Sequence, residues 1–464
     1  MKKFVPVLFL SLVFLLGCTE KTPPPVVPSG TLELWTAESP NFFEALGREF
    51  TSTIKADDLN VRVTTFETQE ELQETLIDTL ADGNGPDVIV ADTDFIFQNS
   101  NKFVPLGSDE TLNAEYFSKN FLPASFEGLV FNSAILGVPL GIDSLALIFN
   151  DGNLQTPPVT WEEFRTVTKE ISQPDNSLQR FSHSGAAIGR VDNITRGTEI
   201  LENILFQLVK DFFSEDRSEA VFAQNQGVTS EGVRHNFASE ALRFFTSFAD
   251  PTSSISPAIW NEFLASSAEN KDYQAFVEGK VSVVFGRVGD VKKIVDLIEK
   301  STLANMLSSA HVRVAPLPQF GTTDIPAQKR VIARVIALAV PHSSKDPSLA
   351  WQFLKFALRP DSLRGFYQVS KIPSPKSDLL LEQEADPVFG SFASQAPFAH
   401  PLLLPLDHSY FQKNLEEMTS QVISHMISPE DGLARLEKNF TQKLKRKTEL
   451  KKEIFSKPQN KNAH

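Results

Sequence analysis

Cysteine is nearly absent: it occurs once in the 464 residues, at position 18. The rest of the chain can therefore form no disulfide bond, no thiolate metal cluster and no cysteine-based active site. The chain also lacks a His-Glu-x-x-His zinc pair, a Gly-x-Ser-x-Gly elbow and a Walker loop. We therefore expect no metal, no cofactor and no catalytic residue.

Basic charge is also scarce, with 44 Lys and Arg against 58 Asp and Glu and a formal net charge of −14. This balance excludes nucleic-acid binding, which needs a basic face for the phosphates. The one basic cluster lies near the end of the chain, at Lys443, Lys445, Arg446, Lys447, Lys451, Lys452, Lys457 and Lys461. Residues 441–464 are interpreted as a solvated, frayed tail, and the alternative is contact with anionic lipid headgroups.

The first eighteen residues have the pattern of a processed export signal. Lys2 and Lys3 precede an apolar run from Phe4 to Leu16, which is too short to span a bilayer, and Leu15-Leu16-Gly17-Cys18 follows as a cleavage box. The small residue before the lone cysteine predicts a bacterial lipoprotein in which the Cys18 thiol is acylated. The alternative is an ordinary secretory signal with a chance cysteine.

A proline-rich segment follows the predicted anchor. Residues 19–29 contain Pro23, Pro24, Pro25 and Pro28, which favour a stiff, extended tether. At about 3.1 Å per residue, this tether would hold the folded body roughly 30 Å from the membrane. We therefore expect the protein outside the cytoplasm, lipid-anchored to the bacterial cell membrane.

The remaining chain is longer than the 250 to 300 residues or so that one hydrophobic core usually supports, so two lobes are expected. The first part alternates strands with helices: strands are predicted at Thr31–Trp35, Val61–Phe66 and Asp87–Ala91, and helices from Ser39-Pro40 and over Glu70–Ala81. This alternation predicts a doubly wound α/β unit, with its ligand side at the carboxyl ends of the strands.

Later elements repeat this pattern. A capping box of Thr160 and Glu163 opens a helix in which Trp161 is expected in the core. The other predicted helices are Glu199–Phe213, Pro347–Leu358 and Tyr410–Ile427, and the other predicted strands are Leu145–Asn150, Val281–Phe285, Val312–Ala315 and Val331–Val340.

Several short motifs occur in an order typical of one family. They are Gly85-Pro86-Asp87-Val88, Gly137-Val138-Pro139-Leu140, Pro158-Val159-Thr160-Trp161-Glu162-Glu163-Phe164, Ala275-Phe276-Val277-Glu278-Gly279-Lys280-Val281 and Val314-Ala315-Pro316-Leu317-Pro318. In this order and spacing, from about Thr31 to Phe440, the chain resembles the extracellular solute-binding proteins of family 1, which include the maltose-type sugar binders of ABC importers.

The resemblance implies an α/β periplasmic-binding-protein fold, with two lobes joined by several crossings and a solute held in the cleft between them. Lobe 1 is expected to comprise residues 30–142 and 317–360, and lobe 2 residues 143–316 and 361–440. The implied function is delivery of a small solute, with a carbohydrate favoured, to the transmembrane subunits of an ABC importer. We expect the chain to act as a monomer.

The candidate ligand-binding residues follow the predicted strands or lie at the first crossing. Carboxylates accept charge-assisted hydrogen bonds from sugar hydroxyls, and arginine adds a fork of donors, so five charged residues are candidates: Glu38, Asp92, Asp94, Asp143 and Arg287. Trp260 and Tyr410 are candidate faces for a sugar ring. Ala91 and Val288 stand where maltose-type binders carry tryptophan platforms, which disfavours maltodextrin itself.

Three other functions remain open at this stage. Several carboxylates in one cleft also suit a cationic solute such as a polyamine. A surface lipoprotein with this fold could serve without transport. Asp92 and Asp143 could also form the carboxylate pair of a glycoside hydrolase, which is the least favoured reading.

Overall fold

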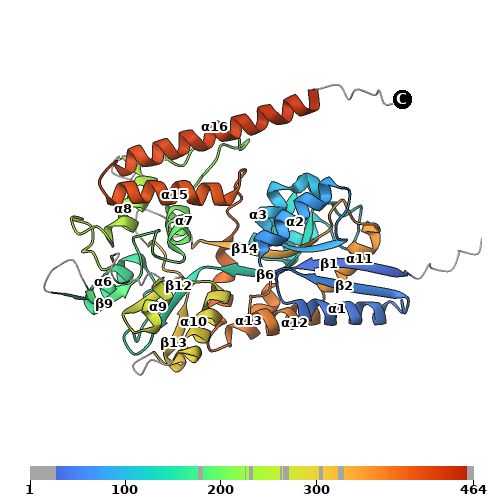
Figure 1. Ribbon diagram of the computed structural model, residues 1–464, viewed down its shortest axis with the longest axis horizontal. Helices are drawn as coiled ribbons and strands as arrows, with labels where there is room; N and C mark the ends of the chain where they lie inside the picture. Colours follow the sequence, from blue (N-terminus) through green and yellow to red (C-terminus); the bar gives the residue numbers. More distant parts are fainter. Residues whose placement is uncertain are drawn as a thin grey trace, which may run out of the picture.

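The chain forms two α/β lobes lying side by side along the long axis of the molecule (Figure 1). The computed structural model describes residues 28–175, 181–224, 226–228, 234–261, 264, 271–301, 307–321 and 329–456. The predicted signal, Cys18 and most of the predicted tether lie outside these ranges. No helix in the described part of the chain combines the length and hydropathy needed to cross a membrane.

Lobe 1 is built on a six-stranded sheet in the order β15-β14-β3-β1-β2, with β6 also paired to β14. The strands are β1 (Gly30–Thr36), β2 (Leu59–Thr65), β3 (Val88–Asp92), β6 (Gly137–Ser144), β14 (Val331–Ala339) and β15 (Ala399–His400). β1 runs parallel to β2 and β3, whereas β14 runs antiparallel to β3 and β6. The carboxyl ends of β1 and β3 therefore lie at the same edge of the sheet.

Helices cover the lobe 1 sheet because their apolar stripes need a partner surface. They are α1 (Pro40–Thr53), α2 (Gln69–Ala81), α3 (Thr93–Gln98), α4 (Ala114–Asn120), α5 (Pro123–Leu129), α11 (Pro347–Ala357) and α12 (Pro360–Ser370). Two short strands, β4 (Val130–Phe131) and β5 (Ala134–Ile135), and the 3-10 turn Ser100–Lys102 complete the lobe. In α1 the predicted stripe is confirmed, since Phe42, Phe43, Leu46 and Phe50 are all buried.

Lobe 2 is built on a five-stranded sheet in the order β13-β7-β12-β9-β8. The strands are β7 (Ala146–Asn150), β8 (Gln173–Pro174), β9 (Phe181–Ala186), β12 (Val281–Gly286) and β13 (Val312–Ala315), and β10 (Gln226–Val228) pairs with β11 (Arg234–Asn236) apart from the sheet. The helices are α6 (Trp161–Ile171), α7 (Gly197–Leu208), α8 (Phe237–Ser247), α9 (Lys271–Val277), α10 (Val288–Lys300), α14 (Gly390–Gln395), α15 (His408–Ile423) and α16 (Pro429–Ser456). α13 (Ser377–Glu384) precedes α14, and 3-10 turns lie at Ser309–His311 and Ala396–Phe398.

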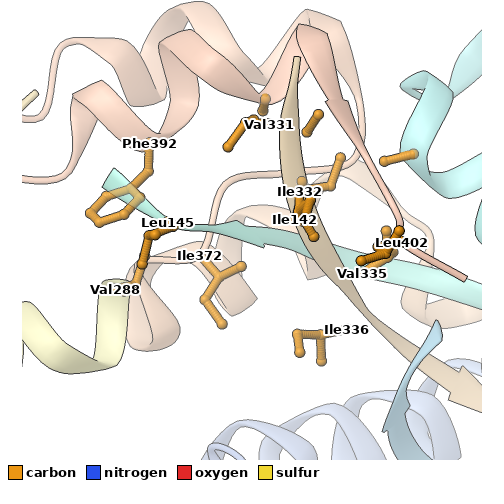
Figure 2. Close-up of a cluster of buried hydrophobic side chains, with 14 of the residues drawn as sticks. Ile142, Leu145, Val288, Val331, Ile332, Val335, Ile336, Ile372, Phe392 and Leu402 are labelled. Carbon is orange, nitrogen blue, oxygen red and sulfur yellow. The ribbon is translucent and has the colours of Figure 1, made fainter. Parts of the chain in front are cut away.

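The chain crosses between the lobes at points where a strand of one sheet is followed directly by a strand of the other. β6 ends at Ser144 in the first sheet and β7 begins at Ala146 in the second, and the chain returns between β13 and β14. An apolar cluster packs around these crossings, with Ile142 on β6, Val335 and Ile336 on β14, and Val288 at the start of α10 (Figure 2). The crossings thus share a core with both lobes.

Most predicted elements are confirmed to within two or three residues, including the α6 capping box and the buried Trp161. The helix predicted over residues 199–213 is wrong at its end, because α7 stops at Leu208. The chain beyond it is extended at Val209, and the Phe212 ring packs against Phe206 and Phe222. Burial of the aromatic side chains there outweighs continuation of the helix.

Two expected boundaries also differ from the structure. α12 was expected in lobe 2 but packs against α1, α11 and β6, because the Phe366 ring contacts Phe42 and Phe43 of α1. Residues 441–456 were expected to be a frayed tail but continue α16, in which Phe440 and Leu444 are buried. Residues 457–464 lie outside the described part of the chain.

Candidate functional site

A cavity of about 370 Å³ lies between the lobes and is lined from both of them. This volume lies within the range of small-molecule sites, about 300 to 1,000 Å³. Lobe 1 supplies charged and polar side chains at the ends of β1 and β3, and lobe 2 supplies them from the loop before α7 and the start of α10. The cavity thus lies at the carboxyl ends of the strands, where open α/β sheets bind ligands.

Glu38 enters the cavity from the loop after β1. The buried hydroxyl of Thr36 accepts a hydrogen bond from the Glu38 amide at 2.8 Å and donates one to the Glu38 carbonyl at 2.7 Å, and this local turn holds the loop. Among the described residues, no hydrogen bond or ion pair engages the Glu38 carboxylate. Its oxygens are therefore available to accept hydrogen bonds from a solute.

Asp92 ends β3 and caps α3. Its carboxylate accepts a hydrogen bond from the Phe95 amide at 2.9 Å, which satisfies one of the free donors at the start of the helix. Asp92 lines the cavity with its other face. The same side chain thus fixes α3 and presents charge to a solute.

Asp143 and Arg334 are directly opposed on the antiparallel strands β6 and β14. The Asp143 carboxylate lies 3.8 Å from a guanidinium nitrogen of Arg287, and the Asp143 carbonyl accepts a hydrogen bond from Arg287 at 2.6 Å. Both strands belong to the crossings. These charged groups therefore lie where the lobes meet.

Arg287 and Arg196 are held by a buried network centred on Glu199. One carboxylate oxygen of Glu199 accepts from Arg287 Nε at 2.8 Å, and the other accepts from Arg196 Nη1 at 2.7 Å. Arg196 also makes a bidentate pair with Asp290 at 2.8 and 3.0 Å. Side chains anchored in this way have little rotamer freedom left, so they present fixed donors to the cavity.

The cavity carboxyl groups are not equivalent electrostatically. Burial raises the pKa of Glu38, and the nearby Asp143 raises it further. Burial also raises the pKa of Asp92 and of Asp143, although arginines oppose the increase at Asp143. Burial acts in the same direction on Glu199, but Arg287, Arg196 and Arg334 together hold its pKa well below the usual range. Glu199 is thus a structural anion, whereas Glu38, Asp92 and Asp143 are desolvated groups that a solute can stabilise by hydrogen bonding.

A second cavity of about 270 Å³ adjoins the first. Both cavities are lined by Gln69, Asp92, Arg196, Arg287 and Arg334. The second one extends to Asp94 on α3 and to His408 on α15. There His408 Nδ1 lies 3.1 Å from Asp94, and Nε2 lies 3.0 Å from Glu202, so the imidazole joins carboxylates from both lobes.

The apolar part of the main cavity is aliphatic. Its apolar lining consists of Val90, Ala91, Val288, Ile336 and Ile372, and no aromatic residue is among the lining residues described. Figure 2 shows Val288, Ile336 and Ile372 gathered at the crossings. Ala91 and Val288 thus line the cavity at the two positions where the resemblance would lead one to expect tryptophan.

The structure brings five of the seven candidate residues to the two joined cavities and leaves two outside. Glu38, Asp92, Asp143 and Arg287 line the first cavity, and Asp94 lines the second. Trp260 is wholly buried in lobe 2, where its indole nitrogen donates to Asn193 at 3.0 Å. Tyr410 packs against Phe440 and Lys443 of α16. Neither ring is among the residues that line the two cavities, because Trp260 is enclosed in lobe 2 and Tyr410 is partly buried against α16.

The sequence analysis did not identify several charged residues of the two cavities, among them Arg196, Glu199, Lys292 and Arg334. Arg334 could have been found, because it interrupts the otherwise apolar strand β14. Glu199 could also have been noticed, since it opens a helix that is buried on nearly every side. Lys292 and Arg196 carry no such local pattern. No group of His, Cys, Asp and Glu within the described ranges is arranged to hold a metal ion.

Comparison with known proteins identifies the family. Residues 45–388, well over half of the chain, match the family model described as bacterial extracellular solute-binding protein. The maltotriose-binding protein of Pyrococcus abyssi is 25% identical over 153 residues, a match that spans 32% of each chain, so only about a third of this relative's length is covered.

Two solved structures show the same fold. A cyclo/maltodextrin-binding protein complexed with maltotetraose is similar over 91% of this chain and 99% of its own, with a TM-score of 0.68 and 18% identity. The sugar-binding protein MalE from Xanthomonas citri is similar over the same shares, with a TM-score of 0.69 and 15% identity. The predicted two-lobed fold is therefore confirmed.

These relatives are named as sugar-binding proteins, not as enzymes. The family description places its members outside the cell. The cavity between the lobes has the position and the polar lining that capture of a small solute requires. The chain belongs to the bacterial extracellular solute-binding protein family.

Proposed function

We propose that this protein is anchored to the outside of the bacterial cell membrane through Cys18, binds a small carbohydrate between its lobes and delivers it to an ABC importer. The observation that carries the proposal is a single cavity lined by Glu38 and Asp92 of lobe 1 and by Arg196 and Arg287 of lobe 2. A solute that contacts both lobes stabilises the closed arrangement relative to the open one. The importer would then recognise the closed form of the protein.

The chemistry of the cavity suits a neutral polyhydroxylated solute. Glu38, Asp92 and Asp143 are acceptors for hydroxyl groups, while Arg287 and Arg334 are donors to ring and hydroxyl oxygens. The relatives support this class, since the named ligands of two of them are maltotriose and maltotetraose. The aliphatic lining offers no aromatic ring for stacking, which favours a short sugar over a long maltodextrin.

A polyamine suits the cavity less well. Its lining includes four basic residues, Arg196, Arg287, Lys292 and Arg334, beside the three carboxylates. A bound polycation would lie close to these side chains. Repulsion between like charges at such distances would weaken its binding free energy by about several kcal/mol. The charge balance therefore favours a neutral solute.

A thermal-shift screen of residues 30–464 tests the ligand class, with sugars, polyols, polyamines and peptides as the candidates. A true ligand at a thousandfold excess over its Kd adds about 4 kcal/mol of stability. We expect stabilisation by a mono- or oligosaccharide. Stabilisation by spermidine alone, with no response to any sugar, would overturn the carbohydrate assignment.

A separate experiment tests the anchor and the transport role. The full chain and a Cys18→Ser variant are expressed in a bacterium, and their membrane and soluble fractions are compared. We expect the wild-type chain in the membrane fraction and the variant outside it. Loss of uptake of the identified sugar on deletion of the gene would distinguish an importer component from a surface lipoprotein without a transport role, in which uptake is unchanged.

A further inference from the structure

The helix α16 has one face packed on the protein and an opposite face exposed to solvent. The packed face carries Leu433, Leu436, Phe440 and Leu444, all of which are buried. These positions recur every three or four residues, the spacing of one side of a helix. Phe440 contacts Tyr410 and Phe411 of α15, and α16 also packs against α8. The first half of α16 is thus fixed rigidly on lobe 2.

The exposed face of α16 is basic. Arg435, Lys438, Lys445 and Arg446 are exposed and lie at helical spacing on the side opposite the packed leucines. Glu437, the only acid between Gly432 and Thr448, is buried and accepts hydrogen bonds from Ala223 and Gln224. No acid is therefore exposed within the strip from Arg435 to Arg446, and the exposed acids Asp431 and Glu449 lie beyond its two ends.

Three of these basic side chains are not neutralised locally. In the described part of the chain, no ion pair involves Arg435, Lys438 or Arg446, whereas Lys445 pairs with Glu219 at 2.7 Å. The chain as a whole has a net charge of −14. On a protein with a strongly negative net charge, this positive strip attracts anions only at its own surface, and the rest of the protein repels them.

α16 lies along one edge of the molecule and runs on past the body of lobe 2 toward the carboxyl end of the chain (Figure 1). From Arg435 to Arg446 the basic strip spans about 17 Å at the rise of an α-helix. A straight, exposed strip of this length can lie along a flat surface over its whole extent, which a strip within a concave site cannot do.

We propose that the exposed face of α16 docks the protein on an anionic phospholipid surface. The inference rests on the lipid anchor of the proposed function, because acylation of Cys18 would keep the body within reach of the membrane. Polybasic segments are attracted to anionic headgroups, and the attraction falls off within a Debye length. Docking through α16 would place lobe 2 next to the membrane and so orient the molecule toward a membrane-embedded importer.

Vesicle co-sedimentation tests the docking face independently of the anchor. The chain from Thr19 to His464, made without its signal and so without acylation, is mixed with phosphatidylcholine vesicles in which about a third of the lipid is phosphatidylglycerol. We expect binding to these vesicles at about 0.05 M salt, loss of binding at about 0.5 M salt, and none to pure phosphatidylcholine.

Charge reversal locates the surface. The triple variant Arg435→Glu, Lys438→Glu, Arg446→Glu should bind the anionic vesicles about tenfold more weakly or worse. The matched control Lys55→Glu, Lys169→Glu, Lys210→Glu changes three exposed lysines outside α16 by the same total charge and should bind like the wild type. If the triple variant fails to fold, as judged by circular dichroism, the single variant Arg446→Gln replaces it and should show a smaller loss.

Three outcomes would overturn the inference: no binding to the anionic vesicles, equal binding to neutral ones, or equal binding by the α16 variant. None of these results bears on whether Cys18 is acylated or a sugar is bound, so failure here is distinguishable from failure of the proposed function. Binding to a soluble acidic protein partner with no binding to vesicles would likewise count against the membrane assignment.

Discussion

Glu38 differs from the other carboxylates of the cavity in how it is held. Asp92 caps α3, Asp143 lies beside Arg287, and Glu199 binds two arginines. The Glu38 carboxylate has no such partner among the described residues, and its pKa is raised by burial. The cost of burying the Glu38 carboxylate is thus only partly offset by its surroundings. A hydroxyl group of a bound solute would donate a hydrogen bond to it.

The substitution Glu38→Gln is therefore expected to weaken solute binding without weakening the fold. Loss of one hydrogen bond to a charged group costs about 1.5 to 3 kcal/mol, which corresponds to about a tenfold to hundredfold increase in Kd. Titration calorimetry with the sugar found by the thermal-shift screen measures the change. The Tm of the unliganded variant should match or exceed that of the wild type, and an unchanged Kd would remove Glu38 from the site.

Asp272, outside the cavity, is expected to make stability depend on pH. Its carboxylate is fully buried and accepts hydrogen bonds from the amide and hydroxyl of Thr195, and one of its oxygens has no partner. Burial raises the pKa of Asp272 to about 6. Because the folded-state pKa lies above the unfolded one, the unfolded chain releases this proton first as the pH rises, and stability falls between about pH 4 and pH 6.

The variant Asp272→Asn removes this titration. Relative to the wild type, its free energy of unfolding should rise by about 1 kcal/mol between pH 5 and pH 8. Urea denaturation at the two pH values measures the difference, and comparison within each pH cancels the titration of other groups. Parallel pH profiles for the two proteins would show that Asp272 ionises normally.

At the scale of elements, α6 and β9 pack so closely that one glycine decides the contact. A Cβ atom added to Gly185 on β9 would lie 1.9 Å from the carbonyl oxygen of Thr168 on α6. The atoms in this contact belong to the backbone of Thr168, which cannot move away from an added methyl group as a flexible side chain could. The approach of this helix to the sheet therefore requires glycine at position 185.

The substitution Gly185→Ala is expected to destabilise lobe 2 by about 3 kcal/mol or more, in the upper range for single substitutions. The control Gly107→Ala has open space around its added methyl group and should change stability by less than about 0.5 kcal/mol. Chemical denaturation of both variants gives the comparison. Equal stabilities would show that α6 shifts away from β9 at little cost.

The elements that the sequence predicted best are those whose pattern is local. α6 shows this, because Thr160 and Glu163 cap the helix through bonds between near neighbours, and the helix begins where the pair predicts. α7 and α16 show the limit. Whether residues 209–213 and 441–456 are helical depends on how Phe212 and Leu444 are buried in the folded protein, which the helical pattern alone does not specify.

At the scale of the whole molecule, His408 joins the two lobes. Its imidazole lies between Asp94 of lobe 1 and Glu202 of lobe 2, at 3.1 and 3.0 Å. Burial alone would lower the pKa of His408, but Glu202 and Asp94 raise it well above its usual value. The charged imidazole thus compensates two carboxylates that are themselves largely buried.

The variant His408→Gln is expected to separate the lobes and weaken sugar binding. Removing one partner of a buried ion pair costs about 3 to 5 kcal/mol, part of which the protein recovers by opening and hydrating the carboxylates. Small-angle X-ray scattering of the unliganded variant should give a larger radius of gyration than the wild type. An unchanged radius and an unchanged Kd would show that the bridge does not hold the lobes.

The same bridge predicts a pH dependence with a definite sign. Since the folded-state pKa of His408 is raised, its contribution is present at neutral pH and is lost as the pH rises through the raised value. Sugar affinity should therefore fall on the alkaline side in the wild type. The His408→Gln variant, titrated over the same range, should lack this component, and identical profiles would argue against the bridge.

The sequence by itself determined the family, the two α/β lobes and the edge of the sheet at which the cavity lies, because the strand and helix patterns and the helix caps involve residues close together in the chain. It placed Glu38 and Asp92 correctly at strand ends for that reason. Only the tertiary structure decided that Trp260 is buried and Tyr410 packs against α16, and that Arg196, Lys292 and Arg334 line one cavity with Asp143 and Glu38. Those contacts join residues that are far apart in the sequence, and no local pattern of charge or hydropathy specifies which distant side chains meet.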